Sequence, residues 1–249
     1  PPESRSEQRT RRSEPPHMSA TNPESPRKTT TQFIRYELKV VLARAEAERV
    51  QAWAAERLST DPFGDSEGTY EIRTLYLDSP EMEIYHRLGE ARGTKFRVRR
   101  YGEEGKVWLE RKRRRGDRVK KRRASWPLEG LTQLLAGRGT PSEWAGAFQE
   151  AVCDRDLAPV LLVVYPRSAF SGEGSARLTL DWGVKVWRMA PDEDPFDPQG
   201  DPIDVTDDVI LELKYDGTMP EVFDEVLKML GRDTTGFSKY SRGGEAAGL

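Results

Sequence analysis

The sequence predicts an α+β protein in which about eight antiparallel β-strands close into a barrel, or tunnel, with a cationic lumen and helices packed outside. Three observations support this prediction. Segments in which apolar and charged residues alternate recur along the chain, helical segments with an apolar stripe separate them, and one stretch concentrates positive charge. Eight strands are enough to close a barrel, and closure removes the unpaired edges of the sheet.

The positive charge is concentrated in residues 93–123. This stretch holds fifteen Lys and Arg and four Asp and Glu, a net charge of +11 in a chain of 249 residues whose net charge is −2. Such a local excess predicts a polyanionic ligand. Apolar residues such as Phe96 and Val98 alternate with the cations, and this period of two indicates strands rather than a basic tail. A solvated basic face and a nucleic-acid patch stay open as alternatives at this point.

The same alternation places the strands along the chain. Two short turns containing glycine, 102–105 and 116–117, divide the basic stretch into three strands. The predicted strands are 33–42, 70–77, 94–101, 106–114, 118–126, 158–170, 176–186 and 209–215. Apolar residues at helical spacing predict helices at 43–58, 79–88, 128–135, 142–152 and 220–230.

Most predicted strands have one apolar and one charged face, and the charged faces are expected to point inward. A dozen like charges in a dry interior would repel one another strongly. We therefore expect a wide, wet lumen that an anion fills. In the third basic strand, Lys120 and Arg122 are assigned to the charged face.

Composition defines the remaining organisation. We expect a disordered N-terminal tail at 1–31, a single domain at 32–243 and a short disordered C-terminal tail at 244–249. The acidic, proline-containing segment 192–208 predicts a loop. No run of about 18 apolar residues is present, and a single cysteine, Cys153, excludes an internal disulfide. These features predict a cytoplasmic protein without a transmembrane segment.

Nine short segments carry a family resemblance through their order and spacing. They are RYELK (35–39), LYLDSP (75–80), KFRVRRYG (95–102), LERKRR (109–114), VKKR (119–122), YPRSAF (165–170), RLTLD (177–181), LELKY (211–215) and FSKYSRG (237–243). Over about residues 33–243 the chain resembles the VTC-type polyphosphate polymerase domain of the CYTH, or triphosphate tunnel metalloenzyme, superfamily. The resemblance implies an eight-stranded tunnel that binds ATP, triphosphate or polyphosphate.

The resemblance also implies roles for individual residues. It assigns phosphate binding to Lys39, Arg97, Arg99, Lys112, Lys120, Arg122, Arg167 and Lys239, with hydroxyl contacts from Tyr165 and Ser238. Five of these cations would act directly in catalysis: Arg97, Arg99, Lys112, Arg167 and Lys239. Glu212 matches the metal-binding glutamate, and Glu37 is a second candidate ligand. The implied cofactor is a divalent metal, Mn²⁺ or Mg²⁺.

One departure from the superfamily pattern bears on the reaction. The hydrolases and cyclases begin with Glu-x-Glu-x-Lys, whereas this chain has Arg35 at the first position. Losing a carboxylate weakens a two-metal site and favours transfer of the terminal phosphate of ATP to a growing polyphosphate chain over hydrolysis. Two alternatives stay open: an inorganic triphosphatase or other CYTH-type hydrolase, and a non-catalytic polyphosphate or inositol-phosphate sensor. No nucleic-acid partner is expected, and a separate membrane partner is compatible with the sequence.

Overall fold

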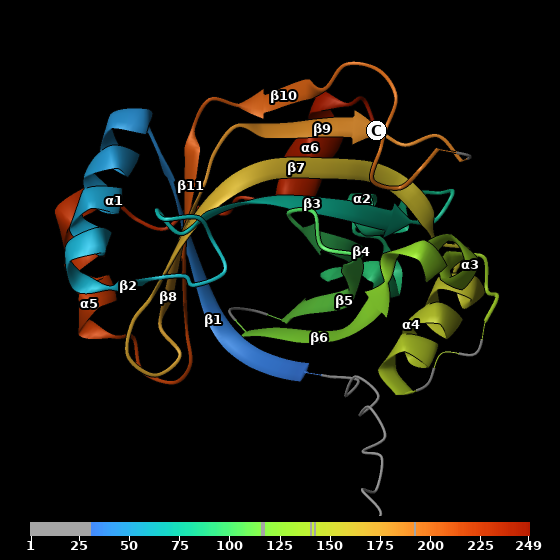
Figure 1. Ribbon diagram of the computed structural model, residues 1–249, viewed down its shortest axis with the longest axis horizontal. Helices are drawn as coiled ribbons and strands as arrows, with labels where there is room; N and C mark the ends of the chain where they lie inside the picture. The colour runs from blue at the N-terminus through green and yellow to red at the C-terminus, as the bar shows by residue number, and fades with distance from the viewer. Residues whose placement is uncertain (1–30, 116–117, 140, 142, 192) are drawn as a thin grey trace, which may run out of the picture.

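The structure of the protein is a computed structural model that describes residues 31–115, 118–139, 141, 143–191 and 193–249 (Figure 1). The predicted N-terminal tail lies outside these residues, apart from Thr31 at the start of the first strand. None of the helices in the described ranges is long and apolar enough to cross a membrane.

Eight antiparallel strands form the closed barrel that the sequence predicts. They are β1 (Thr31–Leu42), β3 (Thr69–Asp78), β4 (Thr94–Tyr101), β5 (Lys106–Arg115), β6 (Arg118–Pro127), β7 (Ala158–Ser171), β8 (Arg177–Asp181) and β11 (Val209–Tyr215). Their order is β7-β3-β4-β5-β6-β1-β11-β8, and β8 pairs again with β7. The predicted α+β fold is therefore confirmed.

Three shorter strands extend the sheet: β2 (Ser59–Thr60), β9 (Val184–Arg188) and β10 (Ile203–Thr206). The single strand predicted at 176–186 is two strands, because β8 and β9 pair with different halves of β7. The loop predicted at 192–208 is partly wrong, since β10 lies within it and pairs with β9. The acidic composition concealed this strand.

The helices are α1 (Arg44–Arg57), α2 (Glu83–His86), α3 (Leu131–Leu135), α4 (Glu143–Asp154), α5 (Glu221–Leu230) and α6 (Lys239–Ala246). Two 3₁₀ turns, η1 (Gly89–Ala91) and η2 (Leu128–Gly130), join them. Helix α2 is shorter than predicted because Met82 and Arg87, on either side of it, adopt left-handed backbone angles, φ 55° and 59°.

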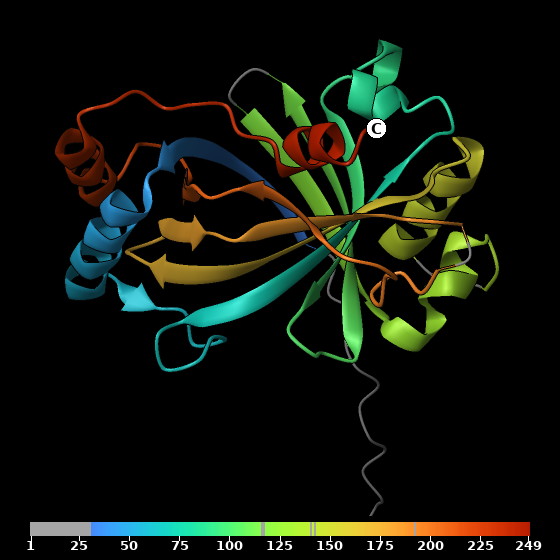
Figure 2. The ribbon, with the colours of Figure 1, turned by 90° about the horizontal axis from the view of Figure 1, so that it is seen from above.

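The apolar cores lie between the barrel wall and the helices. On one side, Val50 of α1 and Phe223 of α5 pack against Leu211 of β11. On another, Phe148 of α4 packs against Phe96 of β4, with ring centroids 5.7 Å apart. Figures 1 and 2 show α1 with α5, and α3 with α4, on opposite sides of the barrel along the long axis of the molecule. Because the outer faces of the strands supply these cores, the inner faces are left to polar residues.

The C-terminal segment is ordered, and the disordered tail predicted at 244–249 is wrong. Helix α6 includes Gly244, which is buried, and Leu249 packs against the larger apolar core. The Leu249 amide also donates to the Gly244 carbonyl at 2.9 Å. Short polar and glycine residues suggested a tail, but here they allow close approach to neighbouring side chains.

Candidate functional site

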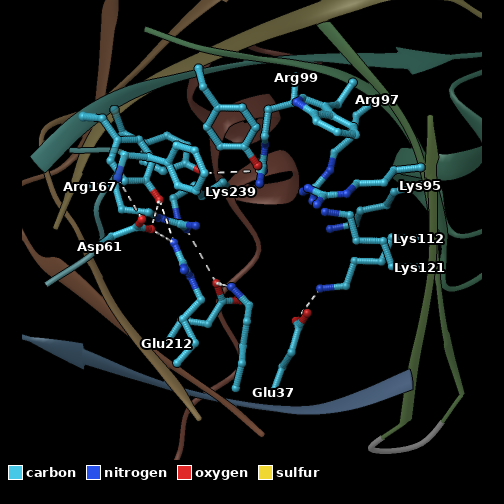
Figure 3. A pocket seen from close by; sticks show the side chains of 18 of the residues that line it. Glu37, Asp61, Lys95, Arg97, Arg99, Lys112, Lys121, Arg167, Glu212 and Lys239 are labelled. Carbon is cyan, nitrogen blue, oxygen red and sulfur yellow. Dashed lines mark hydrogen bonds and ion pairs between the residues drawn. The ribbon is translucent and has the colours of Figure 1, made fainter. Parts of the chain in front are cut away.

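The inner faces of the strands line a cavity of about 640 Å³ inside the barrel (Figure 3). Five acids contribute to its wall, against twelve cations: Lys39, Lys95, Arg97, Arg99, Lys106, Lys112, Lys121, Arg123, Arg167, Arg177, Lys214 and Lys239. The lumen is therefore strongly cationic although the whole chain is slightly acidic.

The structure brings most of the predicted site residues together in this lumen. Those that line it are Glu37, Lys39, Arg97, Arg99, Lys112, Tyr165, Arg167, Glu212, Ser238 and Lys239. They come from β1, β4, β5, β7 and β11, and from the first residue of α6 with its N-cap Ser238. Their shared orientation follows from the alternation of side chains along each strand.

The assignment of Lys120 and Arg122 to the lumen is wrong. Strand β6 places Lys121 and Arg123 in the cavity instead, and Arg122 lies outside the barrel with its guanidinium 4.6 Å from the Trp144 ring centroid. The cause is the register of the β5–β6 hairpin. Strand pairing sets Arg115 opposite Arg118, and counting back along both strands sets Lys112 opposite Lys121. Opposite residues share a face, so the predicted turn already contained this information.

Strands β4 and β5 form a first cluster around Glu110, which is fully buried. Arg97 donates to Glu110 through Nε and lies 2.7 Å away through Nη2, while Lys121 forms an ion pair with the other carboxylate oxygen. Burial would raise the pKa of Glu110, but Lys121, Arg97 and Arg99 hold it well below its usual range. Glu110 is thus an internal counter-ion that fixes the direction of two lumen cations.

A second buried carboxylate, Asp181 on β8, orients two further cations. Arg167 donates to its two oxygens at 2.5 and 2.7 Å, a fork geometry suited to carboxylate. Lys239 of α6 donates to the same carboxylate at 2.5 Å. Burial opposes ionisation of Asp181, yet Arg167 and Lys239 keep its pKa far below the ordinary value. The sequence placed Asp181 on a charged face but assigned it no role.

Glu37 and Glu212 occupy adjacent strands in the lumen. Glu212 accepts from Lys214 at 2.6 Å and lies 3.4 Å from Lys39 and 3.6 Å from Arg167, whereas Glu37 accepts from Lys112. Burial would raise both pKa values, but the neighbouring lysines lower them, so both groups are carboxylates at neutral pH.

This pair fits a hard divalent cation. Carboxylate oxygens suit Mg²⁺ and Mn²⁺, and Mg²⁺ is commonly held by one or two carboxylates together with substrate phosphates and water. Among the described residues, no three His, Cys, Asp or Glu side chains form a group that could hold a metal without such help. A metal here would therefore depend on the bound phosphates for its other ligands.

The segment that leads into α6 closes part of the lumen near the start of β4. Lys95 donates to the Ser238 hydroxyl at 2.6 Å, and Lys39 donates to the Phe237 carbonyl at 2.9 Å. Burial, together with Lys112, Lys39 and Arg97, lowers the pKa of Lys95 well below its usual value. An anion bound beside Lys95 would stabilise the charged form of this side chain, because it replaces the interactions with water that burial removes. Lys95 was not among the predicted site residues, although it lies on the same face of β4 as Arg97 and Arg99.

Aromatic and charged residues meet near the other end of β4. Arg177 contacts Asp61 and donates to the Tyr70 hydroxyl at 2.9 Å. Phe63 also lines the cavity here and is 85% exposed. The lumen therefore has a different chemical character toward each end.

A cavity in which cations outnumber acids, with several cations oriented by buried carboxylates, has the composition of an oxyanion-binding tunnel. The VTC domain family matches residues 34–247, and the chain belongs to that family. No curated protein sequence matches the chain.

Solved structures of low sequence identity are similar to the chain. A candidate adenylate cyclase from Bacillus halodurans is 14% identical with a TM-score of 0.55, over 83% of this chain and 95% of that one. A Hippeastrum adenylyl cyclase candidate, described as having dominant triphosphatase activity, is 13% identical with a TM-score of 0.49, over 85% and 95% of the two chains. At this identity the likeness to the first structure shows the fold alone.

Proposed function

We propose that this protein is a polyphosphate polymerase that transfers the terminal phosphate of ATP to a growing polyphosphate chain inside the tunnel. The observation that carries the proposal is the row of oriented cations in the lumen of a VTC domain, with the carboxylates Glu37 and Glu212 in its wall. Phosphoryl transfer needs positioning and charge neutralisation more than it needs a covalent nucleophile.

The chemistry requires few further groups. The bond between the γ-phosphorus and the β–γ bridging oxygen breaks, a bond from the γ-phosphorus to a terminal oxygen of the acceptor chain forms, and ADP leaves. The acceptor oxygen is already ionised, so no strong base is required. Arg97, Arg99 and Arg167, which line the cavity, would bind and align non-bridging oxygens of the chain together with Lys112 and Lys239.

Glu37 and Glu212 are the residues that would hold a divalent cation. When bound, Mg²⁺ or Mn²⁺ supplies charge neutralisation between adjacent phosphates. The lysines that now pair with these carboxylates would turn toward the phosphates, because each gains an anionic partner there.

Incubation of the protein with ATP and Mn²⁺ tests the proposal. A polyphosphate ladder on a gel, with ADP released in proportion to the phosphate incorporated, is the expected result. Release of phosphate from triphosphate without chain growth would instead identify a hydrolase. Tight polyphosphate binding by a protein that turns over neither ATP nor triphosphate would identify a sensor.

A further inference from the structure

The outside of the β5–β6 hairpin carries a second set of cations, here named the outer cationic row: Arg111, Arg113, Lys120 and Arg122. The register sets Arg111 directly opposite Arg122, and Arg113 directly opposite Lys120. Like charges that face each other across two strands destabilise a sheet. The row is therefore costly to the fold unless something else offsets the repulsion.

The protein itself supplies little compensation. Among the described residues, no ion pair involves Arg113 or Lys120, and both are exposed. Arg111 and Arg122 place their guanidiniums 4.9 and 4.6 Å from the Trp144 ring centroid. Burial, then Arg122, Arg113 and Arg155, lower the pKa of Arg111.

Several exposed cations elsewhere on the surface have acidic partners. On α1, α5 and α6 they pair with acids three or four residues away: Arg44 with Glu48, Lys228 with Asp224, and Arg242 with Glu245. The outer cationic row differs from these helix surfaces because its cations face one another across two strands, and such a local excess of positive charge favours an external anion.

The outer cationic row lies on the opposite face of two strands that line the lumen. Lys112 and Lys121 line the cavity, while their chain neighbours Arg113 and Lys120 lie on the outside of the same two strands. Consecutive Cα atoms are about 3.8 Å apart, so only the thickness of the sheet separates the two sets. In Figure 3, Lys112 and Lys121 extend from these strands into the cavity.

We propose that the outer cationic row is a second binding site, for the part of a polyphosphate chain that extends beyond the lumen. The ligand class rests on the proposed function. A linked second contact raises the affinity for a long chain without changing the affinity for a short one. A nucleic acid is less well matched, because single strands stack their bases on exposed aromatic rings, and Trp144, the ring within this row, is 4% exposed.

The test compares a double variant, Arg113→Gln with Lys120→Gln, with the wild type. Lys185→Gln with Arg188→Gln is the matched control, because both residues are exposed cations of β9. The probes are inorganic triphosphate and long-chain polyphosphate. The hairpin variant is expected to bind triphosphate like the wild type and to bind long chains about tenfold more weakly. Its logarithmic salt slope for long chains should fall by about 1.4, as for two lost phosphate contacts.

Long-chain affinity equal to that of the wild type and the control would overturn the proposal. If the double variant also loses triphosphate binding, the single variants Arg113→Gln and Lys120→Gln are measured. Each single variant must then weaken the binding of long chains and leave triphosphate binding unchanged. An oligonucleotide of equal charge that binds this row more tightly than polyphosphate would overturn the ligand assignment. Failure to make polyphosphate from ATP would count against the proposed function but leave these binding differences intact.

Discussion

Two buried glutamates in the barrel, Glu110 and Glu212, show that the same residue type can have different roles. Glu110 is fully buried and its partners are cations of adjacent strands, whereas Glu212 reaches the cavity and is surrounded by Lys39, Lys214 and Arg167. A carboxylate in the wall stabilises the cations, and a carboxylate in the lumen is in addition available to a metal.

Replacing Glu212 with Gln should separate binding from turnover. The variant loses one negative charge in a cationic lumen, so metal-free triphosphate should bind at least as tightly as in the wild type. Chain growth from ATP should fall by at least about a hundredfold, because neutralisation by a metal acts chiefly on the transition state. Wild-type rates in this variant would contradict the metal assignment.

Glu110→Gln is the matched comparison and should act on the fold. Removing one partner of a buried ion pair leaves Arg97 and Lys121 uncompensated, which typically costs about 3–5 kcal/mol of unfolding free energy. Denaturant unfolding should therefore show a much lower midpoint for this variant. An unchanged midpoint would mean that Glu110 does not act as a counter-ion.

Lys121 should make triphosphate binding depend on pH. Burial, reinforced by Arg97 and Arg99 and only partly offset by Glu110, lowers its pKa to about 7. Between this pH and the unfolded value near 10.5, the unfolded chain binds one more proton, so this group increasingly favours folding as pH rises. An anion favours the charged form, so affinity should decrease as pH rises through 7.

Comparison of the wild type with Lys121→Arg isolates the contribution of Lys121 to this pH dependence, because triphosphate itself titrates in the same way in both experiments. Arginine stays charged throughout this range, so the variant should show a flatter dependence of affinity on pH between 6 and 9. Identical profiles for both proteins would show that Lys121 does not titrate in this window.

At the scale of single elements, the sequence predicted strands well where one face packs and the other is charged. Period-two alternation placed Arg97 and Arg99 of β4 in the lumen correctly. The alternation predicted the wrong inward face for β6, because cations occupy both odd and even positions of this strand. Only the register of the β5–β6 hairpin decides which face points inward. The prediction of transfer over hydrolysis rested on Arg35, and the side chain of this residue lies outside the described part of the structure.

Helix α6 could not be predicted, since its sequence has no apolar stripe of ordinary size. It holds its position through Tyr240, whose ring stacks on Tyr76 at 4.7 Å, and through two glycines that permit close packing. A Cβ at Gly244 would lie 2.4 Å from the Tyr85 ring. These contacts depend on tertiary structure rather than on local pattern.

Gly244→Ala should accordingly displace α6 and the Ser238–Lys239 segment that it carries. Overpacking of this kind costs about 1–3 kcal/mol, and triphosphate affinity should fall as well. Gly236→Ala is the control, because no atom lies within 4 Å of a Cβ built there. Equal stability of the two variants would argue against close packing of α6.

At the scale of the whole molecule, the barrel separates charge. The chain has 42 acids and 40 cations, yet cations outnumber acids twelve to five around the cavity. The acids therefore lie mainly on the outside, including the segment that contains β10. Glu110 and Asp181 offset part of the repulsion within the lumen from inside the wall.

The remaining repulsion makes the fold sensitive to its ligand. An anion that binds only the folded state stabilises it by mass action, about 2.7 kcal/mol at a concentration 100 times the dissociation constant. Triphosphate should therefore raise the melting temperature, and the shift should decrease at high ionic strength as salt screens the lumen. The same concentration of monophosphate should have a smaller effect, because it reaches fewer cations at once. A melting temperature that triphosphate leaves unchanged at low salt would contradict an anion-binding lumen, and with it both the polymerase and the sensor.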